Sequence, residues 1–321
     1  MSDAAALQRA DILPEKFLDP DITVDGSPRA RVGLDRLETL WFNTGSLCNL
    51  TCTNCYIESS PRNDRLVYIT TMEVQAYLDE IVEQGLPTKE IAFTGGEPFM
   101  NPDIIAILDA SLAAGFQTLV LTNAMRPMMK HADGIADLQE RYSGMLTLRV
   151  SLDHYDQPLH DRLRGELSWD RTIPGLQFLT QTGVRTHIAG RTCWDETEEE
   201  LRQGFARLFA RTGLAINADD PMELVLFPEM DETADVPEIT EACWDILDVS
   251  PSSMMCATSR MIVKRKGAER PVVLPCTLLP YDPYFEMGHT LESASDTVKL
   301  NHPHCATFCV LGGASCSRTE D

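Results

Sequence analysis

The chain has 321 residues, which is long enough for one large domain and a smaller second one. Its composition, 43% hydrophobic and 24% charged, is ordinary for a globular protein. With 49 acidic and 27 basic residues the formal net charge is −22, so phosphate backbones and anionic membranes are repelled, and we expect neither as a partner.

The first 36 residues predict a loose N-terminal extension, because Pro14, Pro20 and Pro28 interrupt any helix there. This segment is polar and acidic and lacks the basic and apolar regions of a signal peptide. No apolar run is long enough to predict a membrane-spanning helix. We therefore expect a cytoplasmic protein, whose ten cysteines are ligands or buried thiols rather than disulfides.

Residues 37–235 alternate between predicted strands and predicted helices. The strands are expected within 36–45, 89–98, 117–125, 144–153, 184–193 and 222–230. The helices are expected within 70–85 (capped by Thr71), 103–115, 171–183 (after Pro174) and 197–213. Such alternation is typical of a parallel sheet, and about six units fall short of the eight of a closed barrel. The predicted fold class is α/β, a partial (β/α)6 TIM-like barrel.

Three cysteines stand within eight residues after the first predicted strand, in SLCNLTCTNC: Cys48, Cys52 and Cys55. A structural zinc site takes four ligands and a disulfide takes two, so three thiols are an unusual number. Three thiolates can hold three irons of a four-iron cluster and leave the fourth iron open to a ligand that is not protein. A zinc site completed by a distant residue is the alternative.

The run CNLTCTNC, followed by Tyr56, resembles the cluster motif of the radical S-adenosylmethionine (radical SAM) superfamily. Further segments resemble the family's motifs in the same order: TGGEP (94–98), LTNA (121–124), VSLDH (150–154), RLRG (162–165) and HIAG (187–190). The resemblance implies a [4Fe–4S] cluster that binds S-adenosylmethionine at its open iron. An external reductant of the flavodoxin or ferredoxin type would supply the electron that cleaves the cofactor, and the resulting 5′-deoxyadenosyl radical would take hydrogen from a substrate.

The resemblance also implies a set of cofactor contacts at the carboxyl ends of the strands, where α/β proteins place ligands. Glu97 would accept from the methionine ammonium, and an arginine of RLRG, Arg162 or Arg164, would reach the carboxylate. His154 is expected to be structural rather than a base. The cofactor-binding residues predicted in this way are Tyr56, Gly95, Gly96, Glu97, Pro98, Asn123, Ser151, Asp153, Arg164 and Ile188.

Residues 236–321 are rich in cysteine and predict a small cluster-binding domain. With the segment 275–294 they resemble the auxiliary-cluster extension of the superfamily, called SPASM or, when shorter, twitch. Five thiols are too few for two fully ligated four-iron clusters, so we expect one auxiliary [4Fe–4S] cluster. A zinc knuckle and an incompletely ligated second cluster are the alternatives. The candidate ligands are Cys256 and Cys276 with two of Cys305, Cys309 and Cys316.

The predicted function is that of a radical SAM enzyme of the oxidoreductase type, acting on a small metabolite or a peptide. No separate peptide-recognition domain is visible before the barrel, which favours a metabolite or a peptide without a leader. The alternative from another class is a non-catalytic iron–sulfur electron-transfer or scaffold protein. TGGEP and VSLDH argue against it, because an electron carrier needs no cofactor cleft.

Overall fold

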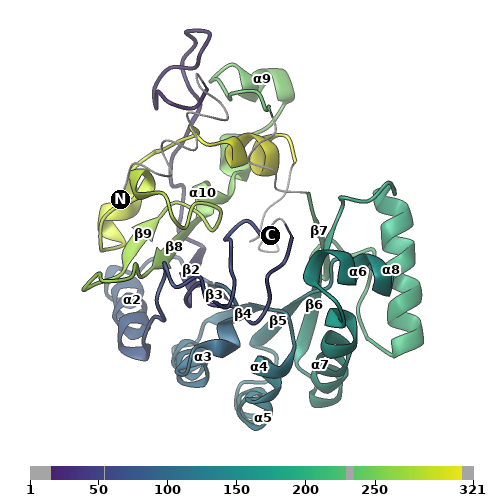
Figure 1. The fold of residues 1–321 in the computed structure, drawn as a ribbon. Coiled ribbons are helices and arrows are strands. Elements are labelled where there is room, and N and C mark those ends of the chain that lie inside the picture. Colours follow the sequence, from purple (N-terminus) through teal and green to yellow (C-terminus); the bar gives the residue numbers. More distant parts are fainter. Residues whose placement is uncertain (1–15, 54, 229–234, 313–321) are drawn as a thin grey trace.

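The computed structural model describes residues 16–53, 55–228 and 235–312. Its centre is a sheet in which six strands run parallel and follow one another in chain order. Figure 1 shows them as an open arc with the helices along its outer side. This confirms the predicted α/β fold and partial barrel. The strands are β2 (Thr39–Asn43), β3 (Glu90–Thr94), β4 (Gln117–Thr122), β5 (Leu146–Ser151), β6 (Arg185–Arg191) and β7 (Leu224–Phe227).

The helices cover the outer face of this sheet, where side chains such as Phe42, Phe93, Leu148 and Ile188 join one large hydrophobic cluster. Burial of this continuous apolar surface is the main stabilising contribution to the barrel. The helices are α2 (Thr71–Gln84), α3 (Ile104–Ala113), α4 (Arg126–Met129), α5 (Ala132–Arg141), α6 (Gln157–Arg164), α7 (Ser168–Thr182) and α8 (Glu198–Thr212). Of these, α4, α5 and α6 were not predicted.

Two predicted helix starts were wrong. Thr70, not Thr71, caps α2: its side chain accepts from the Glu73 N–H while the Glu73 carboxylate accepts from the Thr70 N–H. Helix α7 begins at Ser168, six residues before Pro174, which lies inside the helix. The reason is Asp161, whose carboxylate accepts from the Trp169 N–H (2.8 Å) and satisfies a donor that would otherwise be unpaired at the helix start.

The C-terminal part extends the barrel sheet, which the sequence did not predict. β8 (Ser259–Val263) pairs parallel to β2, and β9 (Val272–Leu274) pairs antiparallel to β8, so the sheet has eight strands in the described part of the chain. The segment 231–248 contains α9 (Cys243–Leu247) within its described portion. The remaining elements are α10 (Met255–Thr258), β10 (Val298–Lys299), four 3-10 turns (Pro98–Met100, Pro251–Ser253, Pro283–Phe285, Glu292–Ser295) and a π-helix, Cys305–Val310.

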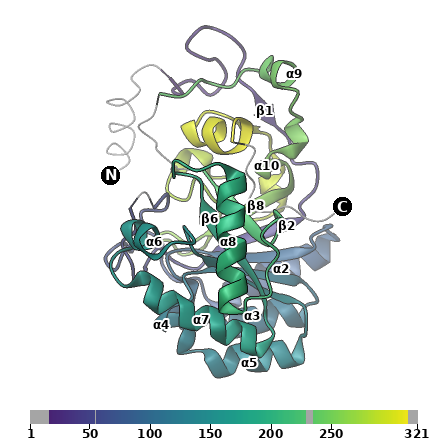
Figure 2. The same ribbon diagram turned by 90° about the vertical axis from the view of Figure 1, so that its right-hand side faces the viewer.

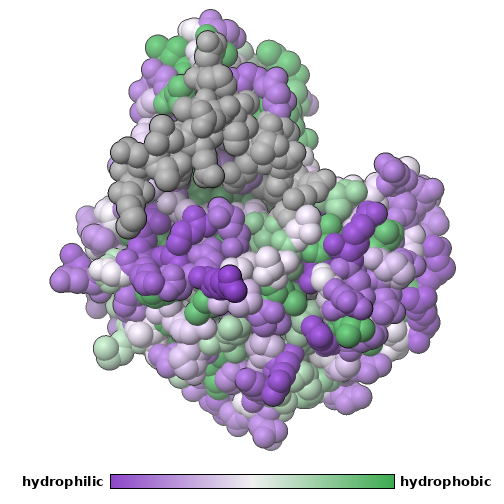
Figure 3. All heavy atoms as spheres, in the orientation of Figure 1, coloured by the Kyte–Doolittle hydropathy of each residue, from purple (hydrophilic) through white to green (hydrophobic). Residues whose placement is uncertain are grey.

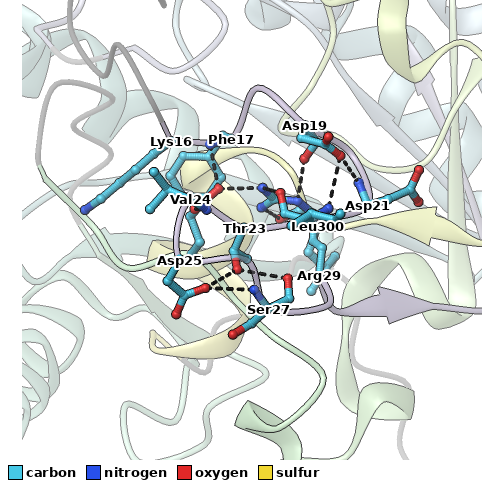
Figure 4. Close-up of polar contacts among 12 residues, drawn as sticks. Lys16, Phe17, Asp19, Asp21, Thr23, Val24, Asp25, Ser27, Arg29 and Leu300 are labelled. Carbon is cyan, nitrogen blue, oxygen red and sulfur yellow. Dashed lines mark hydrogen bonds and ion pairs between the residues drawn. The ribbon is translucent and has the colours of Figure 1, made fainter.

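The N-terminal segment is not loose from residue 16 onward. β1 (Arg31–Val32) pairs antiparallel with β10. The buried Arg29 donates to the carbonyl oxygens of Asp19 (2.8 Å) and Leu300 (3.3 Å), as Figure 4 shows, and it forms an ion pair with Glu238 at 2.5 Å. These contacts join the beginning of the chain to its C-terminal part.

The side view in Figure 2 shows β1, α9 and α10 above the barrel, on the same side as the C-terminal segments. The face drawn in Figure 3 is mostly hydrophilic over the barrel, with hydrophobic residues scattered among the polar ones. Among the described residues, no helix combines the length and the apolar composition that crossing a membrane requires.

Candidate active site

A cavity opens at the carboxyl ends of the barrel strands, below the C-terminal part. It contains about 1100 Å³ of space not filled by protein atoms, its open mouth included. The cysteine loop, the turns after β3 to β6 and several apolar side chains form its wall. The lining residues are Cys48, Cys52, Cys55, Tyr56, Ile57, Ser59, Thr94, Gly95, Gly96, Leu121, Thr122, Asn123, Ser151, Asp153, Arg164, Ala189, Gly190, Arg191, Phe227, Leu278 and Phe308.

The cysteine loop is held by hydrogen bonds from its own backbone. The Cys48 N–H donates to the Ser60 carbonyl at 3.1 Å, and the Thr53 N–H donates to the Leu163 carbonyl of α6 at 2.8 Å. The C-terminal part contributes as well, since the Tyr281 hydroxyl donates to the Ile57 carbonyl at 2.7 Å. The loop is therefore fixed from both sides before any cofactor binds.

The two glycines of TGGEP allow close approach of two backbone segments. The Gly96 N–H donates to the Gly45 carbonyl at 2.8 Å. A Cβ atom at Gly96 would lie 2.1 Å from the Leu47 carbonyl oxygen, and one at Gly95 (φ +148°) would lie 2.6 Å from the Gly45 oxygen. Both glycines line the cavity, but the atoms that exclude a side chain at these two positions belong to the segment that leads into Cys48.

The three thiols of the loop have the chemistry of cluster ligands. Burial raises the pKa of Cys48 to about 12, and burial also raises the pKa of Cys52, against the opposing effect of the Arg164 cation. Thiols in such a setting become thiolates when a metal cation binds them. In the described part of the chain no three His, Cys, Asp or Glu side chains converge on a point where one metal ion would sit. In a four-iron cluster each thiolate binds a different iron, so thiols that stand apart around one cavity are suited to such a cluster.

Glu97 lies behind the cavity wall rather than in it. Its carboxylate accepts from the Thr122 hydroxyl (2.8 Å), the Asn123 N–H (2.8 Å) and the Phe99 N–H (3.2 Å). Burial raises the pKa of Glu97 to about 7 despite these donors. Pro98 is also buried behind the wall, as the first residue of a 3-10 turn. Asn123, by contrast, lines the cavity.

Asp153 and Arg164 form a nearly buried ion pair at the cavity. Arg164 Nε donates to Asp153 Oδ2 at 2.7 Å and Nη2 to Oδ1 at 3.0 Å. Burial alone would raise the pKa of Asp153, but the Arg164 guanidinium together with Arg191 and His160 holds that pKa below its usual range. Ser151 lines the cavity beside this pair, whereas Arg162 lies over the Trp194 ring at 5.0 Å. Of the two arginines of RLRG, Arg164 is the one at the site.

His154 and Ile188 point away from the cavity. His154 Nδ1 accepts from the Asp156 N–H at 3.0 Å, so the neutral ring carries its proton on Nε2, which lies 2.7 Å from Glu196 Oε2. Both ring nitrogens are thus engaged, in keeping with the expected structural role. Ile188 packs in the core on the helix side, and its neighbours Ala189 and Gly190 line the cavity instead.

Eleven lining residues were not among the predicted site residues. Thr94, Leu121, Thr122, Ala189 and Gly190 lie within the motifs quoted above, whereas Ile57, Ser59, Arg191, Phe227, Leu278 and Phe308 lie outside them. Phe227 and Phe308 stack with ring centroids 5.6 Å apart. The position of Phe227 at the end of the last predicted strand could have indicated it, because neighbouring strand ends meet at one edge of the sheet. Phe308 and Leu278 come from the C-terminal part, and no sequence signal connects them with the barrel.

A second, smaller pocket lies in the C-terminal part. Cys256, Cys276, Cys305 and Cys309 all line it, and Leu278 lines both this pocket and the barrel cavity. Burial raises the pKa of Cys256 to about 11. Cys316, the fifth candidate ligand, lies outside the described residues.

The sequence model of the Radical SAM superfamily matches residues 42–207, which is 166 of the 321 residues and includes the three clustered cysteines. The chain belongs to the radical SAM superfamily. Members of this superfamily are enzymes, and the family implies a [4Fe–4S] cluster and S-adenosylmethionine.

Several curated proteins are similar to this chain. The AdoMet-dependent heme synthase of Oleidesulfovibrio alaskensis is 30% identical over 172 residues, covering 53% of this chain and 40% of that protein. The subtilosin biosynthesis protein AlbA of Bacillus subtilis is 32% identical over 143 residues, covering 44% and 30%. The mycofactocin maturase MftC of Mycolicibacterium smegmatis is 25% identical over 184 residues, covering 57% and 44%. The chain thus spans less than half the length of these relatives.

Several solved structures share the fold of this chain. Streptococcus suis SuiB bound to S-adenosylmethionine superimposes with a TM-score of 0.58 at 16% identity, covering 79% of this chain and 63% of SuiB. Native anSMEcpe with bound AdoMet gives a TM-score of 0.58 at 14% identity, and the match covers 81% of each chain. The coverage exceeds the 166 residues of the family match, so the likeness in fold continues beyond the barrel core.

Proposed function

We propose that this radical SAM protein is an enzyme in which Cys48, Cys52 and Cys55 hold a [4Fe–4S] cluster and the barrel cavity binds S-adenosylmethionine. The observation that carries the proposal is that three thiols and the polar ends of four strands line one cavity. When bound, the two groups supply one-electron cleavage of a sulfonium and hydrogen abstraction from a substrate. An external reductant of the flavodoxin or ferredoxin type provides the electron.

The chain's own residues bind and orient the cofactor in this proposal. Tyr56, Gly95, Gly96, Asn123 and Ser151 contact it from the wall. The Asp153–Arg164 pair offers a carboxylate and a guanidinium fixed against each other, so each can bind a cofactor group of opposite charge without rearranging.

Glu97, Pro98 and Ile188 support that wall from behind. Glu97 fixes the turn that carries Asn123. It also remains our candidate acceptor for the methionine ammonium, a contact for which the carboxylate would have to give up one of its present donors and turn toward the cavity.

In the C-terminal part we propose one auxiliary [4Fe–4S] cluster, held by Cys256, Cys276, Cys305 and Cys309. Support comes from the four thiols around one pocket, with Cys305 and Cys309 four residues apart on the π-helix. Cys316 is then the spare thiol. Zinc in the same pocket is the competing assignment, and metal analysis separates the two.

The substrate is proposed to bind between the two sites, against Phe227, Phe308 and Leu278, with Arg191 as a cationic group nearby. A peptide is the favoured class, because similar proteins include AlbA, MftC and a SuiB structure with its precursor peptide SuiA. A small metabolite is the second candidate, favoured by the similarity to AdoMet-dependent heme synthase. We keep the expectations of a cytoplasmic location and of no nucleic-acid or membrane partner.

The barrel site is tested by S-adenosylmethionine cleavage in the anaerobically reconstituted protein under strong reductant. Replacing Cys48, Cys52 or Cys55 by alanine should abolish 5′-deoxyadenosine formation, because each thiolate fixes one iron. Cys243→Ala is the matched control, since Cys243 lines neither pocket and its sulfur lies 3.4 Å from the Thr240 hydroxyl. Undiminished cleavage in the three variants would refute the assignment.

The auxiliary cluster proposed for the C-terminal part is tested by measuring the metal content of the protein. The reconstituted protein should hold about eight irons, and the double variant C256A/C276A should lose about four of them. Cys316→Ala should keep all of them, because the other four C-terminal thiols already surround the pocket. About four irons together with bound zinc in the unaltered protein would instead show that the C-terminal thiols bind zinc.

A further inference from the structure

Arg260 is a buried cation within the C-terminal part. Its side chain is about 1% exposed, and it extends from β8 beside the second pocket. Within the described residues, all its hydrogen bonds go to backbone carbonyl oxygens. Nε donates to Ala294 (2.8 Å), Nη1 to Cys256 (2.6 Å) and Ser259 (2.8 Å), and Nη2 to Asp296 (3.4 Å).

No carboxylate compensates the charge of Arg260 among the residues that the structure describes, since none of their ion pairs includes it. Arg29 shows the contrast: it is equally buried, also donates to carbonyl oxygens, and has Glu238 at 2.5 Å. A buried charge is strongly unfavourable unless an opposite charge accompanies it. A guanidinium does not avoid this by losing its proton.

The ionisable groups that act on Arg260 are the thiols of Cys256 and Cys276. Burial lowers the pKa of Arg260, and these two sulfur groups oppose that effect. Both thiols line the second pocket together with Cys305 and Cys309. A four-iron core with four thiolate ligands carries a net charge of about −2. Bound in this pocket, such a cluster would supply a negative charge that compensates the buried guanidinium of Arg260.

We propose that Arg260 is the countercharge of the auxiliary cluster and raises its reduction potential. The inference depends on the cluster proposed above for this pocket. Reduction adds one negative charge to the cluster, and a cation fixed nearby in a medium of low dielectric constant stabilises the reduced form more than the oxidised form. Hydrogen bonds to the Cys256, Ala294 and Asp296 carbonyls fix the guanidinium in place, so Arg260 acts as a positioning and tuning residue and touches no substrate.

The test is a redox titration of the anaerobically reconstituted protein, followed by electron paramagnetic resonance, with Arg260→Gln and Arg260→Lys. In Arg260→Gln the equilibrium constant for reduction of the auxiliary cluster should fall at least tenfold, which is 59 mV for a one-electron couple. Arg260→Lys keeps the charge and should stay within that margin of the unaltered protein. The barrel cluster in the same sample should not shift, which controls for the preparation.

Iron content, measured first, separates this inference from the proposed function. Unaltered protein without a second cluster refutes the tail assignment and this inference with it. With two clusters present, an unshifted potential in Arg260→Gln overturns the inference alone. If Arg260→Gln loses the cluster while Arg260→Lys retains it at the original potential, the charge is what matters and the inference stands. If both variants lose it, Arg260 serves only to anchor backbone carbonyls, and the inference is wrong.

Discussion

The contact between TGGEP and the chain before Cys48 predicts a large effect from the smallest possible substitution, Gly96→Ala. The added Cβ atom would lie 2.1 Å from the Leu47 carbonyl oxygen, and about 3.4 Å is the lower limit of ordinary contact. One segment must therefore move by about 1.3 Å, the difference between these distances. Leu47 directly precedes the first cysteine, so the movement reaches the thiol that would bind iron.

The cost follows from the nature of the clash. Overpacking inside a protein costs about 1–3 kcal/mol, and a backbone oxygen cannot turn aside as a flexible side chain can. The hydrogen bonds from the Gly96 N–H to Gly45 and from the Glu97 N–H to Leu47 would weaken as well. We expect a loss near the upper end, about 3 kcal/mol of unfolding free energy. A displacement of this size also disturbs a reacting geometry severely.

Urea denaturation of the cluster-free protein measures the first effect, and iron content with 5′-deoxyadenosine formation after reconstitution measures the second. Gly33→Ala is the control, because among the described residues, its chain neighbours aside, no atom lies within 4 Å of the Cβ position there. We expect Gly96→Ala to lose barrel iron and cofactor cleavage while it retains the tail iron. If it matched Gly33→Ala in stability and iron content, the steric reasoning would be refuted.

Three further predictions concern the charged groups. Asp153→Asn should cost about 3 kcal/mol in urea denaturation, because it leaves the Arg164 guanidinium, 14% exposed, without its carboxylate; an unchanged midpoint would contradict this. Burial lowers the pKa of His160 to about 4, so the unfolded chain takes up its proton first on acidification, and stability should fall by about 3 kcal/mol between pH 6.5 and 4. His160→Asn, which keeps an acceptor for the Asp153 N–H, should flatten that decline, and equal pH profiles would count against the argument. At a net charge of −22 the protein should not retain RNA or DNA in moderate salt, and salt-sensitive micromolar binding would reopen a role on nucleic acids.

The barrel could be predicted from the sequence because its signals are local. Apolar runs such as IAF in β3 and LVL in β4 are each followed by a glycine or polar turn, and that pattern survives in the structure. The hairpin of β8 and β9 was missed because the cysteines dominated the interpretation of the tail. Its signal was present: MIV and VVL are apolar runs on either side of KRKGAER, a turn-forming segment. That β8 would pair with β2, more than 200 residues earlier, has no local signal.

The candidate site divides in the same way. Cys48, Ser151 and Asp153 could be placed because each belongs to a motif at a strand end, and the structure brings them to one cavity. Glu97 was expected to face the cofactor, but the structure buries it beneath the cavity wall. That position depends on how the end of β4 packs against the turn formed by TGGEP. Arg260 could not be predicted, because what distinguishes it is that no described carboxylate pairs with it, and only the three-dimensional surroundings show this.

Strand β8 also occupies the edge of β2 that would otherwise present unpaired backbone groups. A chain shortened to end before residue 259 would leave that edge open along Thr39–Phe42 and ready to pair with other copies. Expression of the barrel alone would then report aggregation, and its inactivity would not test whether the C-terminal part takes part in catalysis. Any exchange of the C-terminal part between relatives would likewise have to preserve the pairing of β8 with the first strand of the barrel.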